Sequence, residues 1–302
     1  MSGSAETAVV LFSHGTVENL DDLHGFVTNI RRGRPPPKEV VDELRHRYQA
    51  IGGHSPLGDI TRELARLVEA RLGLPTRVAM RMWHPYPEEV LAQLAAEGIE
   101  RVVVVPLAQH STAAYAEAME RAAGHVSAEK AKPLEVRCAK NWGASPDLTA
   151  AFADSIGEAW NALSEDVRAK ATVVMTAHSV PMSVIQAGDP YEREVRKSAE
   201  AIGHALGVPY EVAFQSQGMG GGEWLGPDLP STLDALAGRG QKHVLFAAIG
   251  FLSDHVEVLY DLDIEAAALG KARGLTTSRA ASLNVASRFV DAVVGVAKEL
   301  LA

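Results

Sequence analysis

The chain has 302 residues, 47% of them hydrophobic, which is enough for a large core and predicts two domains. Its formal net charge of −9 argues against nucleic acid as a main partner. A single cysteine, Cys138, excludes a disulfide framework, a cysteine zinc site and a four-cysteine iron–sulfur cluster held by this chain alone.

Apolar runs typical of buried strands alternate along the chain with segments that have the spacing of amphipathic helices. Strands that alternate with helices predict parallel sheets with crossover helices, the α/β class. The expected strands cover residues 7–13, 76–82, 101–107, 134–140, 171–177, 210–216 and 242–249, and helical spacing is clear in residues 38–50, 59–72, 87–97 and 192–206.

The two halves of the chain resemble each other. His14 follows the run AVVLFS and aligns with His178, which follows TVVMTA, and RVVVVPLAQHST aligns with HVLFAAIGFLSD in the same order. Two matches in one order predict a duplicated α/β unit, with chance likeness of short strand–loop–helix segments as the alternative. We expect domains at residues 1–142 and 143–302, with a cleft between them and with the last helix, about 283–301, able to pack back on the first domain.

His178 stands where a buried strand is expected to end. Ligands of open parallel sheets bind beyond the carboxyl ends of the strands, so a histidine at this place is suited to act on a ligand. A core imidazole that is hydrogen-bonded to the backbone explains the same position equally well. The residues alone leave both interpretations open.

Glu257, Asp261 and Glu265 follow one another at intervals of four residues. On a helix their carboxylates would form one acidic face, which offers hard oxygen ligands that lead a divalent cation toward a partner such as His178. The structural alternative makes Asp254 an N-cap and Glu257 the third residue of a capping box, with the other two carboxylates in solvent. Spacing alone slightly favours this alternative.

Arg31 belongs to a basic island, RRGRPPP at residues 31–37, in an otherwise acidic chain. Guanidinium groups match carboxylates with two parallel hydrogen bonds, so the island is a candidate site for an acidic ligand. A solvated turn stiffened by prolines is the alternative.

Six segments of the chain follow the motif order of a known family: IRRGRPP (30–36), RYQAIGGHSPL (47–57), TAHSVP (176–181), GDPY (188–191), FQSQG with EWLGPD (214–218 and 223–228) and GFLSDHVEVLYDLDIE (250–265). With these segments the chain resembles the ferrochelatases, which insert ferrous iron into a porphyrin in haem synthesis. The resemblance covers nearly the whole chain and implies an α/β protein of two similar Rossmann-like, chelatase-type domains, each a parallel sheet flanked by helices, with the porphyrin in the cleft between them. Several segments are most similar to the enzymes of Gram-positive bacteria, whose substrate is coproporphyrin III rather than protoporphyrin IX.

The resemblance also implies roles for individual residues. His178 and Glu257 match the facing catalytic and metal-site pair, and Asp261 and Glu265 match the acidic metal path that continues from it. Two positions depart from the family pattern: His14 replaces a tyrosine common in the Gram-positive enzymes, and Ala118 replaces another, with Tyr115 almost one turn earlier. The implied porphyrin-binding residues are His14, Arg31, Arg47, Tyr48, Ser55 and Tyr115, and Arg47 is also expected at the outer end of the acidic path.

The implied activity is that of a lyase that inserts Fe2+ into a porphyrin and releases two protons. Fe2+ is then a substrate, haem is the product, and we expect no tightly bound cofactor and no iron–sulfur cluster. The alternatives are a non-catalytic tetrapyrrole or haem carrier and a cobalt chelatase. No apolar stretch approaches the roughly 20 residues that span a bilayer, so we expect a cytoplasmic monomer without a transmembrane segment, with peripheral membrane contact left open.

Overall fold

The computed structural model describes residues 6–130, 133–218 and 222–302, which fall into two compact units. The first unit combines the chain up to Trp142 with Asn284–Ala302, and the second is Gly143–Leu283. The last helix, α13 (Ser287–Leu301), therefore belongs with the first unit, where it contacts α3 and β3. That the two units are separate folding domains stays a prediction.

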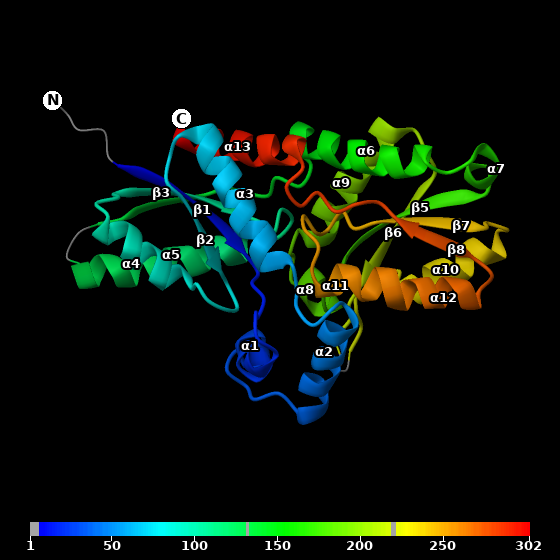
Figure 1. Ribbon diagram of the computed structural model, residues 1–302, viewed down its shortest axis with the longest axis horizontal. Coiled ribbons are helices and arrows are strands. Elements are labelled where there is room, and N and C mark those ends of the chain that lie inside the picture. The colour runs from blue at the N-terminus through cyan, green and yellow to red at the C-terminus, as the bar shows by residue number, and fades with distance from the viewer. Residues whose placement is uncertain (1–5, 131–132, 219–221) are drawn as a thin grey trace. The chain divides into compact units, whose positions relative to one another are not determined.

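The first unit contains a four-stranded parallel sheet in the order β2-β1-β3-β4. Its two central strands are buried along almost their whole length, the pattern expected when helices cover both faces of a parallel sheet. α4 and α5 cover one face, and α3 and α13 cover the other (Figure 1). The elements are β1 (Thr7–Ser13), η1 (Leu20–Asp22), α1 (Leu23–Ile30), α2 (Lys38–Ala50), α3 (Leu57–Leu72), β2 (Thr76–Met80), α4 (Pro87–Ala96), β3 (Arg101–Pro106), α5 (Thr112–Lys130) and β4 (Glu135–Cys138).

The second unit contains a four-stranded parallel sheet in the order β6-β5-β7-β8. α6 and α9 cover one face, and α10 and α12 lie on the other (Figure 1). No helix among the described residues has the length and apolar composition needed to cross a bilayer. The elements are α6 (Pro146–Asn161), α7 (Glu165–Arg168), β5 (Ala171–His178), α8 (Met182–Gln186), α9 (Tyr191–Leu206), β6 (Tyr210–Gln215), α10 (Leu229–Gly238), β7 (His243–Ala247), α11 (Val256–Leu259), η2 (Asp261–Ala266), α12 (Ala267–Ala272) and β8 (Thr276–Arg279).

The two sheets have the same strand order, with β5 in the place of β1 and β7 in the place of β3. These are the strand pairs that the alignment of the two halves predicts. The prediction of two similar α/β units, each built on a parallel sheet, is confirmed.

The edge strand β8 gives no signal in the sequence, because Thr-Thr-Ser-Arg lacks an apolar run. Polar contacts hold it instead. The His243 ring on β7 lies 2.8 Å from the Thr276 hydroxyl through Nδ1 and 2.9 Å from the Ser278 hydroxyl through Nε2. An edge strand fastened by side-chain hydrogen bonds escapes a search for hydrophobic periodicity.

Candidate functional site

His178 is the last residue of β5, and the seven residues before it in the strand are buried. Its side chain is 40% exposed, so the core-imidazole interpretation is wrong. Nδ1 contacts the carbonyl oxygen of Ser179. Because a carbonyl can only accept, Nδ1 carries the proton and the neutral ring keeps its lone pair on Nε2.

Tyr191, the first residue of α9, fixes the backbone of His178. Its hydroxyl donates to the carbonyl oxygen of His178 at 2.9 Å, and its own N–H donates to Asp189 Oδ1 at 2.9 Å. Burial, reinforced by the nearby Glu257 carboxylate, raises the pKa of the Tyr191 phenol above its usual value. The phenol therefore remains a donor, and the GDPY segment secures the end of β5.

Glu257, in α11, faces His178. Its Oε2 lies 3.4 Å from His178 Nε2, beyond the range of a good N–H···O hydrogen bond. A carboxylate oxygen opposite a nitrogen lone pair is favourable only when a proton or a metal cation lies between them. The pair is therefore arranged to share one positive charge.

The capping-box alternative for Glu257 is wrong. α11 begins after His255, and no side chain caps its first turn. Asp254, the expected N-cap, instead pairs with Arg279 at 3.2 Å and accepts a hydrogen bond from the Ser282 hydroxyl at 2.7 Å. The side chain of Glu257 approaches His178 rather than the start of its own helix.

A close backbone approach brings the segment with Glu257 to the end of β5. Gly250 donates its N–H to the carbonyl oxygen of Thr176 at 2.9 Å. A Cβ on Gly250 would lie 2.5 Å from Ala177 Cα and 2.6 Å from Ala177 Cβ. Glycine is required here because any side chain would push the segment away from the strand that carries His178.

Two consecutive residues at the end of β6 hold the acidic segment. Gln215 pairs in register with His178, and its Nε2 donates a hydrogen bond to the carbonyl oxygen of Glu257 at 2.8 Å. The Ser216 hydroxyl donates to the carboxylate of Asp261. Consecutive side chains of an extended strand face opposite sides, but Ser216 has a left-handed backbone (φ 59°), which lets Gln215 reach α11 while Ser216 reaches η2.

Gln215, Ser216 and Tyr191 are site residues to which reasoning from the sequence assigned no role. Gln215 and Ser216 lie in the segment FQSQG and Tyr191 in GDPY, two of the segments shared with the similar family. Only this shared pattern could have indicated them from the sequence, because each residue makes its contact with a part of the chain that is distant in sequence.

The acidic residues do not lie on one continuous α-helix, contrary to the prediction. α11 ends at Leu259, and η2 is a π-helix in which the N–H of Glu265 donates to the carbonyl oxygen of Tyr260, five residues back, at 3.0 Å. Asp261 is 2% exposed, whereas Glu265 is exposed. Among the described residues, no three His, Cys, Asp or Glu side chains form a group that could hold a metal ion, and a metal path through Asp261 and Glu265 stays a prediction.

Three of the predicted porphyrin-binding residues are accessible in the first unit. His14 follows β1 and is exposed, with its ring 6.2 Å from that of Phe26 in an edge-on arrangement. Arg31 is exposed at the end of α1. Arg47 is partly exposed in α2, where its Nε donates to Glu43 at 2.8 Å. Their contact with a porphyrin stays a prediction.

The other three predicted porphyrin-binding residues, Tyr48, Ser55 and Tyr115, are buried. The Tyr48 hydroxyl lies 2.8 Å from that of Thr16, and Ser55 Oγ accepts the N–H of Leu57 at 3.3 Å. Tyr115 packs within the hydrophobic core of the first unit. In this conformation their side chains pack inside the first unit, and direct contact with a porphyrin stays a prediction.

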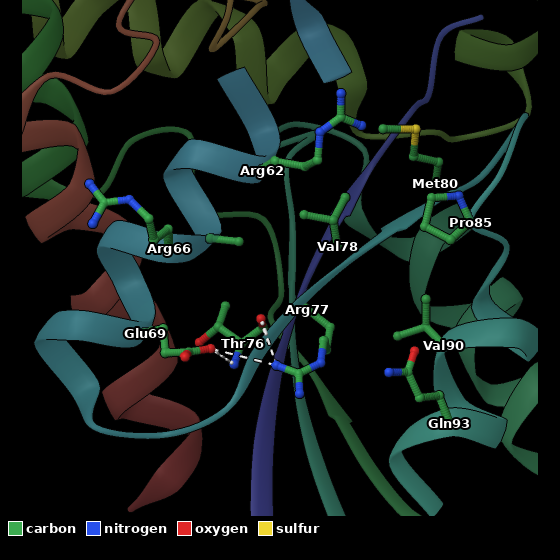
Figure 2. Close-up of a pocket in the computed structure, with 11 residues that line it drawn as sticks. Arg62, Arg66, Glu69, Thr76, Arg77, Val78, Met80, Pro85, Val90 and Gln93 are labelled. Carbon is green, nitrogen blue, oxygen red and sulfur yellow. Dashed lines mark hydrogen bonds and ion pairs between the residues drawn. The ribbon is translucent and has the colours of Figure 1, made fainter. Parts of the chain in front are cut away.

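A groove of about 480 Å³ lies beside β2, the edge strand of the first sheet (Figure 2). Arg62, Arg66 and Arg77 give it a basic lining. Arg77 pairs with Glu69 (Figure 2), with Nη1 3.6 Å from Oε2, and the other two arginines are paired with carboxylates at 2.7–2.8 Å. Because these charges are compensated, the groove gives no reason to assign an anion site.

Comparison by sequence relates this chain to the ferrochelatases. The ferrochelatase family model matches residues 6–301. A ferrochelatase of Acidobacterium capsulatum is 37% identical over 293 residues, covering 92% of this chain and 89% of the relative. A coproporphyrin III ferrochelatase of Bacillus subtilis is 31% identical over 297 residues, covering 95% of this chain and 96% of the relative.

Among solved structures, SirB from Bacillus subtilis with Fe3+ superposes with a TM-score of 0.64 at 13% identity, covering 98% of this chain and 96% of that chain. At that identity the likeness shows the fold alone. It confirms the predicted fold class, two Rossmann-like units of the chelatase type.

Proposed function

The chain belongs to the ferrochelatase family, and on that premise we propose that it inserts Fe2+ into coproporphyrin III and releases two protons. The observation that carries the proposal is the approach of Glu257 Oε2 to the lone pair of His178 Nε2 at 3.4 Å. The choice of coproporphyrin III over protoporphyrin IX is supported by relatives named coproporphyrin III ferrochelatase.

His178 is the base of the proposed reaction. A porphyrin carries two inner N–H protons, and both must leave as Fe2+ binds the four ring nitrogens. Nε2 of His178 accepts one proton at a time, while the bond from Nδ1 to Ser179 holds the ring in place. The Glu257 carboxylate stabilises the resulting imidazolium by between about 1 kcal/mol in water and about 4 kcal/mol near a protein surface. The partial exposure of both groups favours the lower part of this range.

The proton must then leave His178 before the second transfer. Glu257 is the nearest acceptor, and we place Asp261 and then Glu265 next on the path. Asp261 is buried and Glu265 is exposed, so this order leads the proton to the solvent. The same carboxylates are hard oxygen ligands, so Fe2+ can approach along them. Protons that leave and metal that arrives then use the same acidic residues.

The porphyrin carboxylates are the proposed ligands of Arg31 and Arg47, the accessible arginines of the predicted set. His14 is placed on the macrocycle, where an imidazole can replace the tyrosine common in related enzymes. The binding energy from these contacts, which are remote from the ring nitrogens, offsets the cost of bending the macrocycle. Bending turns the nitrogen lone pairs out of the ring plane toward the metal.

We further propose that this lyase acts as a cytoplasmic monomer without a tightly bound cofactor; peripheral membrane contact stays open. The lack of an iron–sulfur cluster is supported by the properties of Cys138, the one cysteine of the chain. Burial, reinforced by the charge of Glu120, raises the pKa of its thiol to about 12, so the thiolate that binds iron is disfavoured.

The test is anaerobic metal insertion by the purified protein, with coproporphyrin III and protoporphyrin IX in parallel and Co2+ compared with Fe2+. We expect Fe2+ insertion into coproporphyrin III, and a fall of about 10²–10⁴-fold in His178→Ala. His204→Ala, at an exposed position near the end of α9, is the matched control and should retain full activity.

Each other outcome contradicts a defined part of the proposal. Turnover of protoporphyrin IX alone would contradict the substrate, and a preference for Co2+ would indicate a cobalt chelatase. Porphyrin binding without metal insertion would indicate a carrier. Full activity in His178→Ala would contradict the assignment of the base.

A further inference from the structure

Arg279, the last residue of β8, joins both sides of the segment that carries Glu257. Its guanidinium forms a two-pronged pair with Asp263, with Nε 2.7 Å from Oδ1 and Nη2 3.0 Å from Oδ2. Its Nη1 lies 3.2 Å from Asp254 Oδ1. Asp254 precedes α11 and Asp263 lies in η2, so one cation spans the stretch that contains Glu257 and Asp261.

The contacts around the Arg279 side chain are extensive, and its partner Asp263 is exposed to water. The Arg279 side chain itself is only 14% exposed. Nη1 also donates to the carbonyl oxygen of Ala280 and to the Ser282 hydroxyl, both at 3.3 Å, and Ser282 donates in turn to Asp254 at 2.7 Å. A bidentate pair is stronger than an ion pair with a single contact and fixes geometry as well as charge.

The segment needs such a support. α11 has four residues and η2 has six, and helices this short are not stable by themselves. The stretch from Asp254 to Glu265 carries five carboxylates, which repel one another. Gln215 holds the main chain of Glu257 from the β6 side, and Arg279 holds the two flanks from the β8 side.

We propose that Arg279 is a positioning residue for metal insertion, which holds α11 and η2 in the place where Glu257 faces His178. The proposal rests on the proposed function, because it deepens the role of the same pair. Arg279 acts through Asp254 and Asp263. Its loss therefore affects the alignment of Glu257 with His178 and not the binding of the porphyrin.

The chain contains a matched control. Arg273, at the end of α12, forms the same two-pronged pair with Asp234 of α10, at 2.7 and 3.2 Å, and its side chain is 20% exposed. This pair joins α12 to α10 and includes no residue of the stretch from Asp254 to Asp263. Both variants lose a two-pronged pair between a largely covered arginine and an exposed aspartate, so an effect that appears in both comes from losing such a pair and not from the segment with Glu257.

The experiment compares Arg279→Met, Arg279→Lys and Arg273→Met with the wild type in anaerobic Fe2+ insertion. We expect Arg279→Met to lower kcat by about tenfold to a hundredfold, as a misplaced catalytic group does, with the KM for porphyrin unchanged. Arg279→Lys should recover part of kcat, because it restores the charge but not the two-pronged geometry. Arg273→Met should retain wild-type kcat.

Hydrogen exchange gives a second readout that does not depend on turnover. Amides of residues 256–266 should exchange faster in Arg279→Met than in the wild type and be unchanged in Arg273→Met. If Arg279→Met does not fold, Asp263→Asn removes one arm of the support and should lower kcat several-fold.

Equal kcat and equal exchange in Arg279→Met and Arg273→Met would overturn the positioning role. Wild-type kcat and wild-type amide exchange in Asp263→Asn would also overturn the positioning role. An inactive wild type would contradict the proposed function instead, while the exchange comparison would still test whether Arg279 supports the segment.

Discussion

The segment after β3 and the segment after β7 occupy the same place in their two sheets, yet they carry opposite kinds of side chain. Extending the alignment of the two halves without a gap places Tyr115 opposite Glu257 and Met119 opposite Asp261. Tyr115 and Met119 lie in the hydrophobic core of the first unit, on α5, one continuous helix of 19 residues. Glu257 and Asp261 lie on a four-residue helix and on the π-helix that follows it.

A shift of one residue separates the two segments. In the second unit the residues that enter the core are Val258 and Leu262, each one position after an acidic residue. One residue corresponds to about 100° of rotation on a helix, so the acidic side chains turn from the core toward the ends of β5 and β6. The same strand order is therefore found with either arrangement, and the acidic one fits the role proposed for Glu257 and Asp261.

Asp261→Met is expected to have the largest effect, because it removes the difference between the two units at this position. Methionine is the residue found at the aligned position of the first unit. Methionine removes the cost of burying a carboxylate but also the hydrogen bond from the Ser216 hydroxyl, so we expect the two effects to offset each other and the Tm to change little. Fe2+ insertion should fall by about tenfold or more, since the acidic path loses a carboxylate. Thermal melts and anaerobic kinetics measure the two effects, and a lower Tm with normal turnover would show that Asp261 serves the fold.

Gly250→Ala tests whether the approach of the segment to β5 requires glycine. The first unit has Ala108 at the aligned position, but in the second unit the new Cβ would meet Ala177 at 2.5 Å. We expect a loss of about 1–3 kcal/mol in the free energy of unfolding, because the backbone of β5 cannot give way. Metal insertion should fall as well, because Glu257 moves with the segment.

Gly238→Ala is the control for this change. Gly238 ends α10, and a Cβ there would meet nothing within 4 Å. Alanine favours helix, so the variant should be as stable as the wild type or slightly more stable. Equal unfolding free energies for the two alanine variants, from denaturant titration, would contradict the steric explanation.

His110→Leu tests how one aligned pair of residues in the two units affects the pH dependence of stability. The aligned residue in the second unit is Leu252, which is buried like His110. Burial lowers the pKa of His110 to about 4, so the folded protein resists the protonation that an unfolded chain undergoes near pH 6.5. The unfolded state then binds more protons, and stability falls as the pH drops from about 6.5 to about 4.

His110→Leu should remove this dependence. At pH 5.5 the wild type should lose about 1 kcal/mol relative to pH 8 through His110, and the leucine variant should not. Denaturant titrations of both proteins at the two pH values measure the difference. An equal loss in both proteins would assign the pH dependence to other groups.

The sequence predicted the sheets well where burial is continuous. Residues 7–13 and 38–50 form the strand β1 and the helix α2 at the expected bounds, and the end of the strand at His178 is displaced by one residue. Uninterrupted apolar runs and amphipathic spacing are local signals, which explains this success. β8 has no such signal, because its four residues form no apolar run. Side-chain hydrogen bonds from His243 help to hold it in the sheet.

The site was predictable only in part. Spacing slightly favoured a capping role for Glu257, and the resemblance to a family, not periodicity, predicted that it faces His178. The contacts of Ser216 and Arg279 join segments more than 15 residues apart in the chain, so no local pattern indicates them. The sequence reasoning also did not predict the π-helix η2.

Glu257→Gln tests the central claim most directly, because it keeps the shape of the side chain and removes its negative charge. The measurement is anaerobic Fe2+ insertion, together with porphyrin binding and the Tm. If Glu257 shares a positive charge with His178, kcat should fall by about a hundredfold while porphyrin affinity and the Tm stay at wild-type values. Wild-type kcat in this variant would contradict the claim that the His178–Glu257 pair carries the reaction.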